Sequence, residues 1–192
     1  MYYYGHSCED IERFIEVKMY YGTYRTKTYI AGDWTGDKNA IDQLRKWNDS
    51  NYWSLSFVDA HDITQAKDSS LNCSIKASLK KRLDVSKTFV LVVGNDTKNL
   101  RSGSCSYCQS YNSYWCGCTR GHSVDLKSYI EYECQQAVNA KMKIVVLYNS
   151  TVINKEKCPD SLKALGTHVA MQYYREGYTY WNYVEVKNAI MN

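Results

Sequence analysis

Apolar residues along this chain fall into short runs that alternate with segments of helical period. The short runs lie at residues 27–32, 53–60, 88–94 and 143–148. They are rich in β-branched and aromatic residues, a composition typical of strands. The run at 88–94 is uninterrupted after its first residue, which indicates a central strand covered on both faces, as in a parallel sheet.

Between and after these runs the apolar positions recur every three or four residues, which is the period of an amphipathic helix. Ser7 and Asp10 have the spacing of a helix cap, so a further helix is expected at the start of the chain. A hairpin that turns at Glu176 and Gly177 is expected within residues 173–181. The predicted helices lie at residues 7–19, 40–47, 70–83, 126–140 and 184–191.

This alternation predicts an α/β fold, with a doubly wound, mainly parallel sheet between two layers of helices. The N-terminal helix and the C-terminal hairpin and helix are additions to a core at about residues 27–148. No linker rich in Pro, Gly or Ser divides the chain, so a single domain over residues 1–192 is expected. Residues 95–125 show little periodicity and carry four cysteines, which indicates an insertion or a functional loop.

Composition excludes some partners. The net charge of +4 is small and its Lys and Arg residues are scattered, so no nucleic-acid partner is expected. No apolar run approaches the roughly 20 residues that a bilayer span needs, so no membrane association is expected. The start of the chain lacks the pattern of a signal peptide, and we expect a cytoplasmic protein with reduced thiols.

A binding site is expected beyond the carboxyl ends of the strands, where ligands of open α/β sheets bind. The loops there carry Asp33 and Trp34 after the first strand and Asp59 after the second, which predicts an acidic rim suited to ribose hydroxyls or a cationic ring. Within the helix at 126–140, Glu133 lies beside the apolar face and Tyr129 lies one turn earlier on the same side. The simpler alternative is a glutamate at the helix border that reaches water, and spacing alone favours it.

Four segments, in their order and spacing, resemble the TIR (Toll/interleukin receptor) superfamily. They are most similar to bacterial TIR-like proteins that include the NAD-consuming subunit of Thoeris antiphage defence. The resemblance covers about residues 27–148 and implies a flavodoxin-like, three-layer fold. The segments are 27–33, 57–62, 86–97 and 128–133.

The resemblance also implies an activity. In enzymes of that family a glutamate on the helix after the third strand is catalytic, and it follows an aromatic residue by four positions. Tyr129 and Glu133 match this pattern, although many relatives carry Trp at the first position. Glu133 would then cleave NAD⁺ at the nicotinamide–ribose bond to give ADP-ribose or a cyclic product, with Asp33, Trp34, Asp59 and Tyr129 lining the NAD⁺ pocket.

Partners implied by the resemblance are further copies of the chain, in a homo-oligomer, and an effector protein downstream. A non-catalytic module that signals by self-association is the main alternative, because tyrosines are concentrated at both ends of the chain. Residues 29–32 also look like the first strand of nucleoside deoxyribosyltransferases, but the Asp-x-Gly-Thr segment of that family is missing. A receiver domain is disfavoured because no Asp ends the strand before Gly94.

The cysteines of the 95–125 segment suggest a metal site. Cys105 and Cys108 form a Cys-x-x-Cys pair, Cys116 and Cys118 form a Cys-x-Cys pair, and His122 is an alternative ligand. These residues could supply the four ligands of a structural zinc ion, which would order the loop. The alternative is a set of free or partly oxidised thiols.

Overall fold

A computed structural model describes residues 27–53, 55, 57–58 and 71–192. The predicted N-terminal helix at residues 7–19 and the candidate site residue Asp59 lie outside the described residues. No helix in the described part of the chain is long and apolar enough to cross a membrane.

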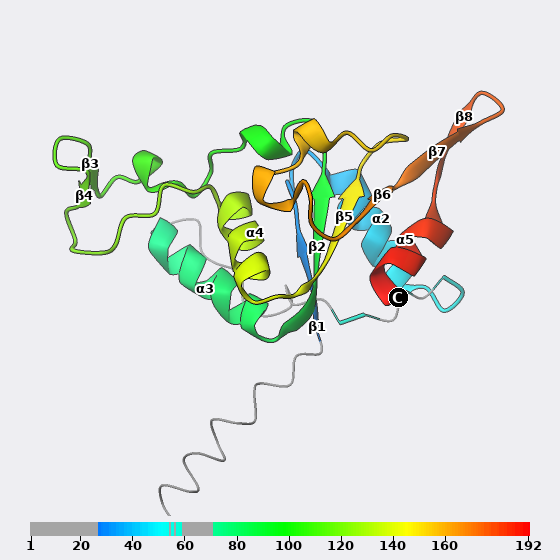
Figure 1. Cartoon of the computed structure of the whole chain (residues 1–192), viewed down its shortest axis with the longest axis horizontal. Helices are drawn as coiled ribbons and strands as arrows, with labels where there is room; N and C mark the ends of the chain where they lie inside the picture. Colours follow the sequence, from blue (N-terminus) through cyan, green and yellow to red (C-terminus); the bar gives the residue numbers. More distant parts are fainter. Residues whose placement is uncertain (1–26, 54, 56, 59–70) are drawn as a thin grey trace, which may run out of the picture.

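The main sheet consists of four parallel strands in the order β1-β2-β5-β6 (Figure 1). Each of its two inner strands contains an uninterrupted apolar run, and Val90 of β2 pairs with Ile30 of β1 on one side and Val145 of β5 on the other. This confirms the strands predicted at 27–32, 88–94 and 143–148. The bounds are Lys27–Ala31 for β1, Ser86–Val93 for β2, Lys143–Tyr148 for β5 and Thr167–Ala170 for β6.

Helices cover both faces of this sheet, so the predicted α/β three-layer fold is confirmed (Figure 1). Phe89, Leu91 and Val93 of β2 pack in one core cluster with α3 and α4, and Val90 and Val92 pack in the other with α2 and α5. The alternation follows from the period of two residues in a strand. The bounds are Lys38–Asp49 for α2, Asn72–Asp84 for α3, Tyr129–Asn139 for α4 and Tyr183–Met191 for α5.

Three details differ from the sequence prediction. The described residues between 53 and 58 form no strand, although the Val58 carbonyl accepts a hydrogen bond from the Thr28 N–H beside β1. Strand β6 was not predicted, because it has only four residues and none of them is fully buried. Helix α4 begins at Tyr129 instead of residue 126, because Ser128 forms a capping box with Glu131.

Two small hairpins project from opposite sides of the molecule (Figure 1). The 95–125 segment carries β3 (Tyr111–Asn112) and β4 (Gly117–Cys118), and the chain near its C-terminus carries β7 (Gln172–Arg175) and β8 (Tyr178–Trp181). The second hairpin was predicted. It turns at Glu176 and Gly177, which have positive φ angles of 52° and 87°, as a type I′ turn requires.

Candidate functional site

A cavity of about 650 Å³ opens beside β1, between α3, α4 and the loops that follow β1 and β2. It brings together four of the five predicted site residues, Asp33, Trp34, Tyr129 and Glu133. The lining residues are Gly32, Asp33 and Trp34 after β1, Arg45 of α2, Ile75, Ser78, Leu79 and Arg82 of α3, Leu100 and Ser102 after β2, and Ser128, Tyr129, Ile130 and Glu133 at the start of α4.

Glu133 is buried in the wall of this cavity, with only 6% of its surface exposed. The capping box at Ser128 sets the phase of α4 so that Ile130, Cys134 and Ala137 enter the core, and Glu133 lies beside them. A glutamate that reaches water, the alternative favoured by spacing, is therefore not what the structure contains. The hydroxyl of Tyr29 on β1 donates a hydrogen bond to Oε1 of Glu133.

Burial raises the pKa of Glu133 to about 7 because the charged carboxylate loses its hydration. The hydrogen bond from Tyr29 and the positive charge of Arg82 act in the opposite direction and lower the pKa. A carboxyl group in this range can exchange between its acid and base forms near neutral pH. Such a perturbed group in a cavity is a recurrent feature of active sites.

Tyr129 is held in place by the segment that precedes its helix. Its hydroxyl donates to Oδ1 of Asn72 at 2.9 Å, and its backbone N–H donates to the Ser102 carbonyl at 2.8 Å. Gly103 approaches its ring so closely that a Cβ there would lie 2.3 Å from a ring carbon. The ring is therefore fixed at the cavity wall by α3 on one side and by the chain after β2 on the other.

Asp33 and Trp34 form another part of the wall. Asp33 Oδ1 accepts a hydrogen bond from the Thr35 N–H at 3.0 Å, so this carboxylate also closes the turn after β1. Trp34 is 37% exposed, and the guanidinium of Arg45 lies 4.7 Å from its ring centroid. The two predicted residues thus combine a structural role in the loop with access to the cavity.

Two cations in the cavity were not predicted from the sequence. Arg45 and Arg82 both line it, so the site is not the purely acidic rim that the sequence suggested. The sequence could have predicted the position of Arg82. It lies seven residues after Ile75 and three after Leu79, so it shares their face of the helix. The sequence does not predict the position of Arg45 in the same way, because its contact with Trp34 depends on how α2 packs against the sheet.

A separate buried network ties the loops at the carboxyl end of the sheet. Asp37, which is 4% exposed, accepts hydrogen bonds from Asn149 at 2.9 Å and from Thr97 at 3.5 Å. Burial, as the largest influence, raises the pKa of Asp37. Gly94 leaves room for this carboxylate, because a Cβ there would lie 2.0 Å from Oδ1. The network fixes the loops after β1, β2 and β5 relative to one another.

The residues of the predicted zinc site are only partly brought together. Cys105, Cys108, Cys118 and His122 line a cavity of about 20 Å³ together with Cys73 of α3. Cys116 does not join them, because its side chain is exposed and its thiol points to the Ser113 carbonyl at 3.7 Å. Among the residues that the structure describes, no three His, Cys, Asp or Glu side chains are placed to hold a metal ion. The described cysteines form no disulfide with one another, and zinc binding stays a prediction.

A model of a known family matches part of the chain. Residues 8–102 match the family model described as Thoeris protein ThsB, TIR-like domain. The matched region includes Asp33, Trp34 and Asp59 and ends before α4, so it does not include Tyr129 or Glu133. No curated protein matches the chain.

Proposed function

Because the chain is a TIR-like protein of the Thoeris type, we propose that this defence-related module is an enzyme that cleaves NAD⁺ at the nicotinamide–ribose bond. The observation that carries the proposal is the single cavity that joins Glu133 to Tyr129, Asp33 and Trp34. Its volume of about 650 Å³ is within the range of small-molecule sites.

Glu133 is the candidate catalytic residue. The nicotinamide of NAD⁺ already carries a positive charge and leaves as a neutral ring, so no general acid is needed. Its departure develops positive charge on the ribose, and a buried carboxylate such as Glu133 stabilises that charge more strongly than one in water does. Since the pKa of Glu133 is about 7, a substantial fraction of the carboxyl group is ionised at neutral pH.

The other cavity residues suit the remaining parts of a dinucleotide. Trp34 offers a partly exposed ring for stacking on a base or on nicotinamide. Asp33 is an acceptor for ribose hydroxyls, and the guanidinium of Arg45, beside Trp34, suits a pyrophosphate. Capture of the ribose by water gives ADP-ribose, whereas capture by an atom of the same molecule gives a cyclic product.

The direct test is NAD⁺ consumption by the purified full chain at high protein concentration, with nicotinamide, ADP-ribose and cyclic products resolved. We expect turnover in the wild type and its loss, by at least 100-fold, in Glu133→Gln. The matched control is Glu131→Gln, two residues away on α4, since glutamine can also complete the capping box. Turnover that survives in Glu133→Gln contradicts the assignment of this residue.

A second candidate function is self-association without catalysis. It is favoured by the hairpin β7–β8, which exposes Tyr173, Tyr174, Tyr178 and Tyr180. Tyr173 and Tyr180 stack across the strands at 5.6 Å, so the hairpin presents a rigid aromatic surface. Concentration-dependent assembly with no NAD⁺ turnover at any concentration would select this function.

A further inference from the structure

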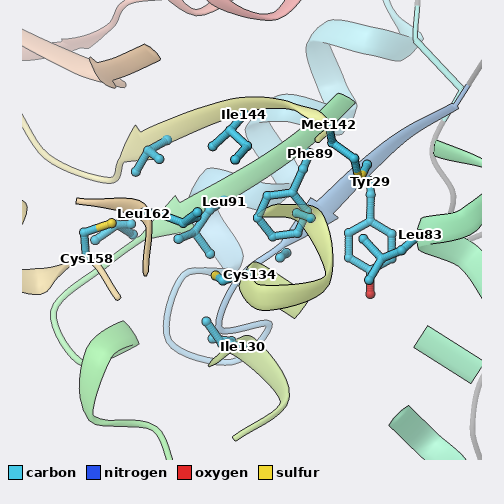
Figure 2. Packing of buried hydrophobic residues seen from close by; sticks show 14 of the residues in the cluster. Tyr29, Leu83, Phe89, Leu91, Ile130, Cys134, Met142, Ile144, Cys158 and Leu162 are labelled. Carbon is cyan, nitrogen blue, oxygen red and sulfur yellow. The ribbon is translucent and has the colours of Figure 1, made fainter. Parts of the chain in front are cut away.

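The position of Tyr29 suggests a role beyond packing. It lies on β1 with no exposed surface, and its ring stacks on Phe89 of β2 with centroids 5.8 Å apart and an interplanar angle of 17°. Figure 2 shows Tyr29 next to Phe89 and Leu83 within the apolar cluster on this face of the sheet. The stacked ring fixes the direction in which the hydroxyl points.

The hydroxyl of Tyr29 donates to Oε1 of Glu133, a residue 104 positions away in the sequence. The other carboxylate oxygen, Oε2, receives no hydrogen bond from any residue that the structure describes. Glu133 lines the cavity, and one oxygen of its carboxyl group is anchored to the sheet. The two oxygens thus have different environments.

We propose that Tyr29 is a positioning residue for Glu133, whose hydroxyl holds one carboxylate oxygen and turns the other toward the cavity. This inference rests on the proposed function in one respect, because it takes Glu133 as the group that reacts. An apolar residue at position 29 would leave the carboxyl free to rotate and without its donor. Because hydrogen bonds to a carboxylate favour the charged form, Tyr29 also keeps Glu133 ionisable near neutral pH.

The charged and titratable groups around Glu133 belong to several elements. Arg82 on α3 acts on the carboxyl by its positive charge, and Cys134 follows Glu133 on α4 itself. Asp33, Arg45 and Tyr129 share the cavity wall. None of these groups is altered by replacing Tyr29 with phenylalanine, so a change in Glu133 titration in that variant reports on the lost hydroxyl.

The test is a direct titration of Glu133 by NMR, using protein labelled with ¹³C at the glutamate carboxyl carbons. The resonance of Glu133 is the one that disappears in Glu133→Gln. We expect Tyr29→Phe to raise the titration midpoint by about one pH unit. The matched control is Tyr148→Phe, which removes another buried strand hydroxyl, one that pairs with His168 at 2.9 Å, and it should leave the midpoint unchanged.

A second variant keeps the test decisive if Tyr29→Phe does not fold. Site-specific 3-fluorotyrosine at position 29 retains the ring and the hydroxyl but is a stronger donor, so it should lower the Glu133 midpoint. An unchanged midpoint in the folded Tyr29 variants, or an equal rise in Tyr148→Phe, overturns the proposal.

The titration does not require NAD⁺ turnover. If the protein has no NAD⁺ turnover but Tyr29→Phe shifts the Glu133 midpoint, the proposed function is contradicted and the positioning role of Tyr29 stands. If the protein is active, the acid limb of its pH–rate profile should move in the same direction as the midpoint in each variant.

Discussion

The raised pKa of Glu133 makes the stability of the folded protein depend on pH. Its pKa rises from an ordinary value of 4.5 to about 7 on folding, mainly because of burial. Between these two values the folded state binds more protons at this position than the unfolded state does. The contribution of Glu133 to stability is therefore most favourable below pH 4.5 and is lost as the pH rises toward 7.

We expect Glu133→Gln to remove this pH dependence. Relative to the variant, the wild type should lose on the order of 3 kcal/mol of unfolding free energy between about pH 4.5 and pH 7.5, since one pKa unit corresponds to about 1.4 kcal/mol. Urea denaturation of both proteins at several pH values across this range measures the difference. A difference that stays constant, or that moves in favour of the wild type as the pH rises, would show that Glu133 is not protonated in the folded protein at acidic pH.

Gly103 permits the close approach of the chain to Tyr129. Its φ angle is +90°, and a Cβ at this position would lie 2.3 Å from the Tyr129 ring. We expect Gly103→Ala to destabilise the protein by about 2–4 kcal/mol, through backbone strain and displacement of the ring. The control is Gly121→Ala, where φ is also positive at +73° but a Cβ meets nothing within 4 Å. Chemical denaturation should show a clearly smaller loss of about 1 kcal/mol for the control.

Among the elements, α3 connects the cysteine-containing segment to α4. Lys76 is only 5% exposed, and its ammonium donates to the carbonyls of Asp125 at 3.1 Å and Lys127 at 2.7 Å. It also lies 3.4 Å from the Asp125 carboxylate. These contacts hold the end of the 95–125 segment just before Ser128, the residue that caps α4.

Lys76→Met should release this connection while keeping the length of the side chain. We expect a loss of about 2–4 kcal/mol in unfolding free energy and faster proteolysis after residues 120–127, because two carbonyls lose a charged donor. Lys80→Met on the same helix is the control. Its pair with Asp84 is largely exposed, so that variant should change the unfolding free energy by less than about 0.5 kcal/mol. Equal effects of the two substitutions would contradict the anchoring role.

The elements differ in how far the sequence predicts them. Strands β2 and β5 are recognisable because a strand covered on both faces needs a continuous apolar run. Strand β6 escapes prediction because its residues Thr-His-Val-Ala are half-exposed. The rim residues Asp33 and Trp34 follow from strand order, whereas the bond between Tyr29 and Glu133 joins positions 104 apart and depends on helix packing that no local pattern encodes.

At the scale of the whole molecule, two hairpins project on opposite sides (Figure 1), and both carry exposed aromatic side chains. The hairpin β7–β8 carries Tyr174 and Tyr178, which are 68% and 69% exposed, and the 95–125 segment carries Tyr114 and Trp115, which are 99% and 63% exposed. Contact between two copies of the same hairpin would close a symmetric dimer. Contact between the hairpin of one copy and the other projection of the next would instead build open chains.

We expect the hairpin to form the symmetric contact, because its stacked Tyr173 and Tyr180 support a rigid surface and, within the described part of the chain, β7 and β8 pair with no further strand. Sedimentation velocity over a range of concentrations should show a monomer–dimer equilibrium in the wild type. The double variant Tyr174→Ser/Tyr178→Ser should weaken dimerisation at least tenfold, whereas Trp115→Ser should leave it unchanged. Species larger than a dimer that disappear in Trp115→Ser would instead establish the open, head-to-tail arrangement.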